Sequence, residues 1–213
     1  MLYKKEIALN NIKETTLQNI LDAAETEFLR KGFKSASLRN IVKSAGVTTG
    51  AFYGYFKNKE ALFSALVKPY ADIFLNKFNE AQITFSELPH DKQPDNMGKI
   101  SGNCMMWMLD YMYEHPNAFK LLICCSEGTE YENFIHTLVE IETDYTHKFF
   151  DVLKSLGYNV KKSDSQLEHI LVSAMFSGFF ETVIHDMPKE KAIVYIRELR
   201  EFYTAGWREI MGI

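Results

Sequence analysis

The sequence predicts an all-α protein of about nine helices. Its 213 residues include only 11 glycines and 5 prolines, whereas sandwiches and barrels of short strands need turn residues roughly every 8 to 12 positions. Hydrophobic residues make up 46% of the chain, which is enough for a sizeable core. These residues recur at helical spacing, so helices are expected throughout.

The first predicted helix begins at Thr15 and ends at Gly32. Thr15 and Gln18 have the spacing of a capping box, and Gly32 suits a C-terminal stop. The apolar stripe between them consists of Leu17, Ile20, Leu21, Ala24 and Phe28.

Two short helices and one long helix follow. Ser37 is the expected N-cap of the second helix, which ends at Gly46, and Thr48 is the expected N-cap of the third. Gly54 is expected inside the third helix, where a glycine costs about 1 kcal/mol relative to alanine, so this helix is expected to fray. Asn58 is the expected cap of the long fourth helix.

The rest of the chain reads as a linker and five further helices. Pro69 is expected to kink the fourth helix, and the linker is the polar segment SELPHDKQPDN, residues 86–96. The helices are expected at about 98–114, 117–126, 130–156, 164–186 and 189–211.

The second and third predicted helices form a helix-turn-helix pattern. They are separated by Gly46 and Val47, and the glycine permits the tight turn. Residues 1–60 carry 10 Lys or Arg against 6 Asp or Glu, whereas the remainder of the chain is acidic. A basic module with this pattern is expected to bind a polyanion.

The segment GFKSASLRNIVKSAGVTTGAFYGYFKNKEALF, which begins at Gly32, resembles the DNA-binding domain of the TetR/AcrR family of bacterial transcriptional regulators. The resemblance covers residues 20–63. It implies a DNA-binding domain at 1–60, with the helix-turn-helix at about 38–57, and a ligand-binding and dimerisation domain at 61–213. The DNA contacts that it implies are Ser37, Thr48, Thr49, Gly50, Ala51, Tyr53, Tyr55 and Lys59.

The aromatic residues of this segment divide between the core and DNA. Phe52 and Phe56 are four residues apart and are expected to point inward. Tyr53 and Tyr55 are expected to hydrogen-bond phosphates through their hydroxyl groups. Gly50 and Ala51 are small enough to leave room in a major groove.

Residues 104–119 are rich in methionine and aromatic side chains, which suit an adaptable apolar pocket. The resemblance implies such a pocket in the second domain and a dimer interface formed by the last two helices. The expected ligand contacts are Trp107, Met108, Tyr111, Phe119, Tyr145, Phe149 and Phe176. The expected interface residues are Ala174, Ser177, Gly178, Tyr203 and Trp207.

The predicted function is that of a cytoplasmic, homodimeric repressor. It binds a double-stranded palindromic operator and is released by a small apolar or aromatic effector, with no cofactor or metal. The alternative is a DNA-binding or scaffold protein regulated by a protein partner, which a core without a cavity of about 300 Å³ would favour. An enzyme is the least favoured class, because the sequence lacks the common catalytic motifs.

Overall fold

The computed structural model describes the backbone of residues 2–161 and 164–213, and the side chains of this part from Lys13 onward. Within these residues the α-helices are nine in number, joined by loops and one short 3-10 helix. The chain divides into two compact units, Met1–Tyr70 with Asn117–Glu132, and Ala71–Pro116 with Asn133–Ile213. The all-α prediction is confirmed.

The first unit contains α1 (Leu2–Ser35), α2 (Leu38–Ser44), α3 (Thr49–Tyr53), the start of α4 (Lys59–Ser86) and most of α6 (Pro116–Cys124). Its core is built on aromatic rings, with Phe63 lying 5.1 Å from Phe28 and 5.3 Å from Phe33 between ring centroids. The other fully buried apolar side chains of this unit include Ile20, Ala24, Ile41, Phe52 and Leu62.

Helix α1 corrects the predicted start of the first helix. It begins at Leu2, not at Thr15, because no glycine or proline interrupts the sequence before Thr15 and the helix-forming residues there continue the helix. Gly32 leaves the helical conformation as predicted, with φ 71° and ψ 161°, although α1 resumes after this kink and ends at Ser35. A positive φ of this kind is available to glycine without steric cost.

The connection between α4 and α5 is shorter than the predicted linker at residues 86–96. A 3-10 helix occupies His90–Lys92, and α5 spans Gln93–Glu114. Pro94 lies in the first turn of α5, where the lack of a backbone N–H has no cost. Gln93 is buried, and its side-chain amide donates to the carbonyl oxygens of Ser86 and Leu88. These bonds stabilise the compact connection.

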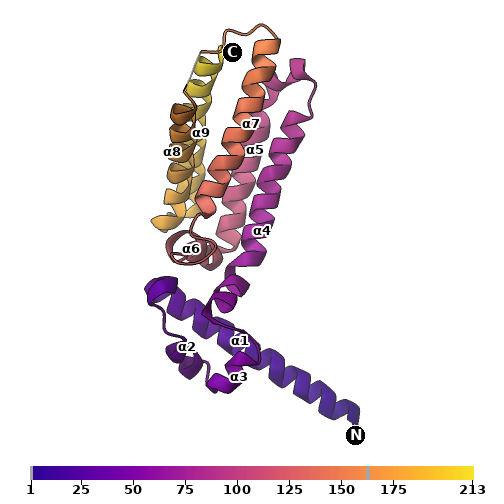
Figure 1. Ribbon diagram of the computed structural model, residues 1–213, viewed down its shortest axis with the longest axis vertical. Helices are drawn as coiled ribbons and strands as arrows, with labels where there is room; N and C mark the ends of the chain where they lie inside the picture. The colour runs from indigo at the N-terminus through magenta and orange to yellow at the C-terminus, as the bar shows by residue number, and fades with distance from the viewer. Residues whose placement is uncertain (1, 162–163) are drawn as a thin grey trace. The chain divides into compact units, whose positions relative to one another are not determined.

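The second unit is a helical bundle formed by the rest of α4 with α5, α7 (Phe134–Ser155), α8 (Ser165–Ile184) and α9 (Lys189–Met211), which run alongside one another in Figure 1. Phe74 is fully buried in this bundle, 5.8 Å from Phe134 and 6.1 Å from Phe180 between ring centroids. A second buried cluster contains Phe149, Phe150, Leu153 and Met211.

Helix α4 contributes to both compact units. It is continuous through Pro69, and the units divide between Tyr70 and Ala71. The predicted boundary between a DNA-binding domain and a ligand-binding domain, at residues 60 and 61, is a functional division and stays a prediction.

Candidate nucleic-acid interface

Polar caps begin the helices of the helix-turn-helix. The Ser37 hydroxyl accepts the Asn40 backbone N–H at 3.4 Å, and the Thr48 hydroxyl accepts the Ala51 backbone N–H at 3.1 Å. The Asn58 side-chain carbonyl accepts the backbone N–H of Ala61 at 2.7 Å, at the start of α4. The predicted caps are therefore confirmed, and each satisfies a backbone donor that the helix leaves free.

The turn between α2 and α3 is closed by backbone hydrogen bonds at Gly46, which has a φ of 69°. The N–H of Gly46 donates to the carbonyl of Lys43, and the N–H of Val47 donates to the carbonyl of Val42, both at 3.2 Å. Ile41 on α2 and Phe52 on α3 are fully buried. The glycine turn and these apolar side chains fix the two short helices relative to each other.

Glu27 of α1 accepts hydrogen bonds from the start of α2. Its carboxylate accepts the backbone N–H of Ser37 at 3.2 Å and the side-chain amide of Asn40 at 3.3 Å. Arg30 and Lys31 form ion pairs with it at 2.6 and 3.2 Å. The hydrogen bond from Arg30, followed by those from Ser37, Lys31 and Asn40, outweighs burial and lowers the pKa of Glu27 to about 2.

Sequence reasoning missed Glu27, although a signal was present. An acidic residue three positions after Ala24 lies on the apolar stripe of α1, and a buried carboxylate there requires partners.

Helix α3 presents a contiguous exposed ridge, which we define as Thr48–Tyr53 without the buried Phe52. Its members are Thr48, Thr49, Gly50, Ala51 and Tyr53, all of them predicted DNA contacts. The Tyr53 side chain is 55% exposed, and its ring packs edge-on against Phe52. The ridge therefore has small residues at its start and an aromatic residue at its end.

Gly54 corrects the predicted extent of the third helix. It is the C-cap of α3 and lies outside the helix, so it does not destabilise the helix interior as was predicted. A Cβ atom at Gly54 would lie 3.2 Å from the carbonyl oxygen of Ala51, which is a tight contact. The glycine allows the helix to end closely at this point.

The two tyrosines differ in their surroundings. The Tyr55 hydroxyl donates to the backbone carbonyl of Lys13 on α1 at 3.3 Å, and the side chain is half-buried. Its hydroxyl is used within the protein, whereas the Tyr53 ring lies on the surface. Phe56 is half-buried with its ring 5.9 Å from that of Phe52.

Lys59, a predicted DNA contact, is engaged within the protein. Its ammonium group donates to the backbone carbonyls of Phe33 at 2.7 Å and Ala36 at 3.0 Å, and lies 4.4 Å from the centre of the Phe33 ring. Burial lowers the pKa of this lysine. The side chain caps the carbonyls at the end of α1, because the start of α4 lies beside them. Lys43 and Lys57, in contrast, are exposed.

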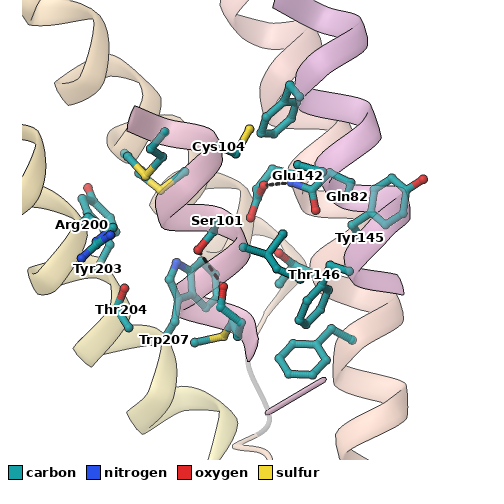
Figure 2. Close-up of a pocket in the computed structure, with 18 of the residues that line it drawn as sticks. Gln82, Ser101, Cys104, Glu142, Tyr145, Thr146, Arg200, Tyr203, Thr204 and Trp207 are labelled. Carbon is teal, nitrogen blue, oxygen red and sulfur yellow. Dashed lines mark hydrogen bonds between the residues drawn. The ribbon is translucent and has the colours of Figure 1, made fainter. Parts of the chain in front are cut away.

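The second unit contains a cavity of about 110 Å³ between its helices. Four of the predicted ligand residues line it, namely Met108, Tyr145, Phe149 and Phe176. The polar side chains around it include Gln82, Glu142 and Arg200, which the prediction missed (Figure 2). The sequence signal that could have identified these three residues is a single polar residue within an otherwise apolar helix face.

Three predicted ligand residues lie elsewhere. Trp107 and Tyr111 stack on each other with centroids 4.9 Å apart and do not line the cavity. Phe119 is buried in α6, within the first unit. Their aromatic character serves packing, which periodicity alone does not separate from ligand binding.

The predicted dimer-interface residues fall into two groups. Ala174 and Ser177 are exposed on α8, and Gly178 is partly exposed, where a Cβ atom would lie 3.4 Å from the Leu199 side chain of α9. Tyr203 and Trp207 are half-buried and line the cavity, and their place in an interface stays a prediction. The exposed apolar residues of α9 are not the ones that were predicted for the interface.

Helices α8 and α9 carry further exposed apolar side chains. On α8, Leu167 and Ile170 are 46% and 59% exposed, and on α9 Val194 and Phe202 are 50% and 73% exposed. With Ala174 and Ser177 they form what we call the α8–α9 stripe. Helix α8 also packs Phe176, Phe179 and Phe180 into the core. Because α8 has apolar residues on both its buried and its exposed face, it is long and apolar enough to cross a membrane. A single helix of this kind is weak evidence for a membrane span.

Known proteins resemble the first unit most closely. A family described as "Bacterial regulatory proteins, tetR family" matches residues 20–66. The HTH-type transcriptional regulator AcrR of Shigella flexneri is 49% identical over 53 residues, which are 25% of each chain. The first curated relatives are thus matched over only about a quarter of their length.

Two other similarities extend along most of the chain. The uncharacterized HTH-type transcriptional regulator YvkB of Bacillus subtilis is 24% identical over 187 residues, covering 84% of this chain and 91% of the relative. The crystal structure of a tetR-family transcriptional regulator from Streptomyces coelicolor superposes with a TM-score of 0.52 at 19% identity, covering 93% of this chain and 86% of the other. The latter similarity establishes the fold alone.

Proposed function

Because the chain belongs to the TetR/AcrR family of transcriptional regulators, we propose that it is a homodimeric repressor that binds a palindromic DNA operator and is released by a small effector. The observation that carries this proposal is the exposed ridge of α3 on a helix-turn-helix. A helix of this motif enters the major groove, where its side chains contact base edges.

The surface of the first unit supports contact with a polyanion. The ridge ends in the exposed Tyr53, which is proposed to hydrogen-bond a phosphate through its hydroxyl group, and Lys43 and Lys57 add exposed positive charge. The small residues Gly50 and Ala51 let the backbone approach the bases closely. Ser37 and Tyr55 are proposed as contacts at the edge of this surface, through atoms not engaged in the protein.

The α8–α9 stripe supports self-association in the second unit. Leu167, Ile170, Ala174 and Ser177 follow one another at intervals of three and four residues, so they share one face of α8. A C2 dimer buries the same face on both protomers, which suits a protein that reads two half-sites of a palindrome.

The cavity of the second unit is the proposed effector site. At about 110 Å³ it is smaller than the roughly 300 Å³ of a typical drug-sized ligand pocket, so a small effector or a rearrangement of the lining is required. Five methionines line it, and their flexible side chains allow such rearrangement. The small volume also favours the second candidate function, a DNA-binding protein regulated by a protein partner without a small molecule.

The remaining parts of the proposal follow from the family. A regulator that acts on bacterial DNA is expected in the cytoplasm, and no enzymatic activity is proposed.

Binding to duplex DNA as a function of salt tests the proposed function. The affinity of the full-length protein for duplexes selected from a random pool is expected to fall steeply between 50 and 200 mM salt, because phosphate contacts release counterions. Ala51→Glu adds a bulky negative charge to the ridge and is expected to abolish binding.

The matched control is Ala65→Glu, which changes an exposed alanine of α4 in the same way. It is expected to leave binding intact. A flat salt dependence, or equal effects of the two substitutions, contradicts the proposal.

A further inference from the structure

The cavity of the second unit holds a carboxyl group with few partners. Glu142 of α7 lines the cavity, and the side-chain amide of Gln82 on α4 donates to one of its oxygens at 2.5 Å. In the part of the chain that the structure describes, no ion pair neutralises Glu142. A carboxylate can accept about four hydrogen bonds, so most of its acceptor capacity is unused.

The surroundings of Glu142 disfavour its negative charge. Burial raises the pKa of Glu142 to about 7, although the hydrogen bond from Gln82 acts in the opposite direction. Leaving a carboxylate in such a place without a counter-ion is costly, and a cationic group would remove that cost. The cavity therefore favours a partner with a positive charge.

The aromatic lining of the cavity favours the same class of partner. Ring faces attract cations electrostatically, and the attraction strengthens where water is excluded. The rings that line the cavity belong to Phe78, Phe85, Tyr145, Phe149, Phe176, Phe179, Tyr203 and Trp207.

From this juxtaposition we propose that the effector is a small organic amine, whose ammonium group is bound by the Glu142 carboxylate and whose alkyl or aryl body packs among the aromatic and methionine side chains. The inference rests on the proposed function, because it assigns a ligand class to the effector site. It adds the charge of the ligand and the residue that recognises it.

The other charged residue of the cavity is Arg200. Figure 2 shows Arg200 on the α9 side, with Tyr203 and Thr204, and shows Glu142 beside Gln82 toward α4 and α7. The guanidinium group packs over Gly102, where a Cβ atom would lie 2.2 Å from Nη1. Arg200 defines the competing ligand class, an organic anion, and the experiment has to separate the two.

The sign of a pH dependence separates the two classes. An ammonium ligand needs the ionised Glu142, so its affinity is expected to fall about tenfold between pH 8 and pH 6 as the carboxyl takes up a proton. The α8 residues that line the cavity carry no titratable group. Burial raises the pKa of Cys104 to about 12 and also raises that of Tyr203, so these groups stay neutral in this range.

The remaining charged groups near Glu142 are engaged or constant. Lys77 and Glu80 of α4 form an ion pair at 2.9 Å, and a guanidinium group such as that of Arg200 is a permanent charge in proteins. On α7, the Tyr145 phenol also lines the cavity, while His147 is bonded to Glu168 of α8. The Glu142→Gln variant assigns the pH dependence to Glu142 and separates it from any contribution of these neighbours.

The experiment measures binding of matched probes to the full-length protein by ligand-observed NMR and calorimetry. The probes are butylamine, hexylamine and octylamine, each with the alcohol and the carboxylate of the same length. At least one amine is expected to bind more than tenfold more tightly than its alcohol and carboxylate at pH 8. Glu142→Gln is expected to remove this preference and the pH dependence, and Arg200→Gln is expected to keep both.

Other results overturn the inference. Binding of no amine, affinity that rises toward pH 6, or preference for a carboxylate that Arg200→Gln abolishes each contradicts it. If Glu142→Gln fails to fold, the sign of the pH dependence in the unchanged protein still decides. DNA binding is measured separately, so a protein that binds DNA but no amine refutes the ligand class and leaves the proposed regulator intact.

Discussion

Two enclosed glutamates have opposite ionisation behaviour because their neighbours differ. Glu27 is surrounded by two cations, a backbone N–H and an amide, and its pKa is lowered to about 2. Glu142 has one amide donor in an apolar cavity, and its pKa is raised to about 7. The number of donors, rather than burial alone, decides which charge state each site stabilises.

Glu27→Gln is expected to destabilise the protein by about 1–2 kcal/mol, because it removes the ion pairs and leaves donors of α2 unsatisfied. The folded-state pKa lies below the unfolded one, so this contribution is present above about pH 4.5 and is lost as the pH falls toward 2. Urea denaturation between pH 2.5 and 7 measures the difference. Glu14→Gln, at an exposed position of the same helix, serves as the control, and an equal effect there contradicts the role of Glu27.

Glu142→Gln is expected to have the opposite effect on stability. Since the folded-state pKa is raised, the protein loses stability as the pH rises from about 4.5 to 7, where the unfolded chain ionises first. The variant lacks this loss and is expected to be more stable than the unchanged protein at pH 8, by up to about 3 kcal/mol. Thermal unfolding at pH 5 and pH 8 tests the prediction, which fails if the gain is the same at both values.

At the scale of the elements, the local signals of the sequence were sufficient for most helices. Ser37, Thr48 and Asn58 could be predicted as caps from residue type, because an N-cap needs only a donor three residues away, which the structure shows for each. The internal bonds of Lys59 were not predicted because its carbonyl partners lie more than 20 residues earlier in the chain. Glu142 was missed for the same reason, since its partner Gln82 belongs to a different helix.

Lys59 gives a prediction that separates stability from DNA contact. Lys59→Met removes the cap at the end of α1 and is expected to cost about 1–3 kcal/mol, as for other hydrogen bonds to charged groups. The slope of log affinity against log salt is expected to stay unchanged. Lys43→Met, at an exposed position of α2, is expected to reduce that slope by about one without loss of stability. If Lys59→Met instead lowers the salt slope without loss of stability, Lys59 is a phosphate contact.

The α8–α9 stripe gives a prediction about assembly. Ile170→Asp together with Phe202→Asp places two charges on the exposed apolar surface and is expected to convert a dimer into a monomer. Sedimentation equilibrium measures the molecular mass in solution. Ile73→Asp changes a 49% exposed residue on α4 and serves as the control that stays dimeric. A dimer that persists in the double variant places the interface elsewhere.

At the scale of the whole molecule, the first compact unit is discontinuous in sequence. Residues 117–132 belong to it, and several bonds connect them to its N-terminal helices. Asn117 donates to Glu25 at 2.7 Å, and the Tyr131 hydroxyl is bonded to that of Ser64 at 2.8 Å. The backbone N–H of Phe33 donates to the carbonyl of Cys125 at 2.8 Å.

Tyr131→Ala is expected to destabilise the helix-turn-helix although it lies more than 70 residues away in sequence from α3. The substitution removes the bond to Ser64 and a ring that lies 6.4 Å from Phe63, at an expected cost of about 2–4 kcal/mol. Hydrogen exchange at the amides of Ile41 and Phe52 is expected to accelerate. Tyr158→Ala, at an exposed position of the second unit, is expected to leave these amides protected, and equal acceleration would contradict the assignment.

The discontinuous unit restricts how this chain exchanges parts with its relatives. A chimera that takes only residues 1–70 from another regulator pairs a foreign α1 and α4 with the native Asn117–Glu132 segment, and mismatches the bonds at Glu25, Phe33 and Ser64. Recombination that transfers both segments keeps each bond with its original partner. Under the proposed function, transfer of the complete DNA-binding unit therefore requires both blocks of sequence, although the proposed DNA contacts belong to only one of them.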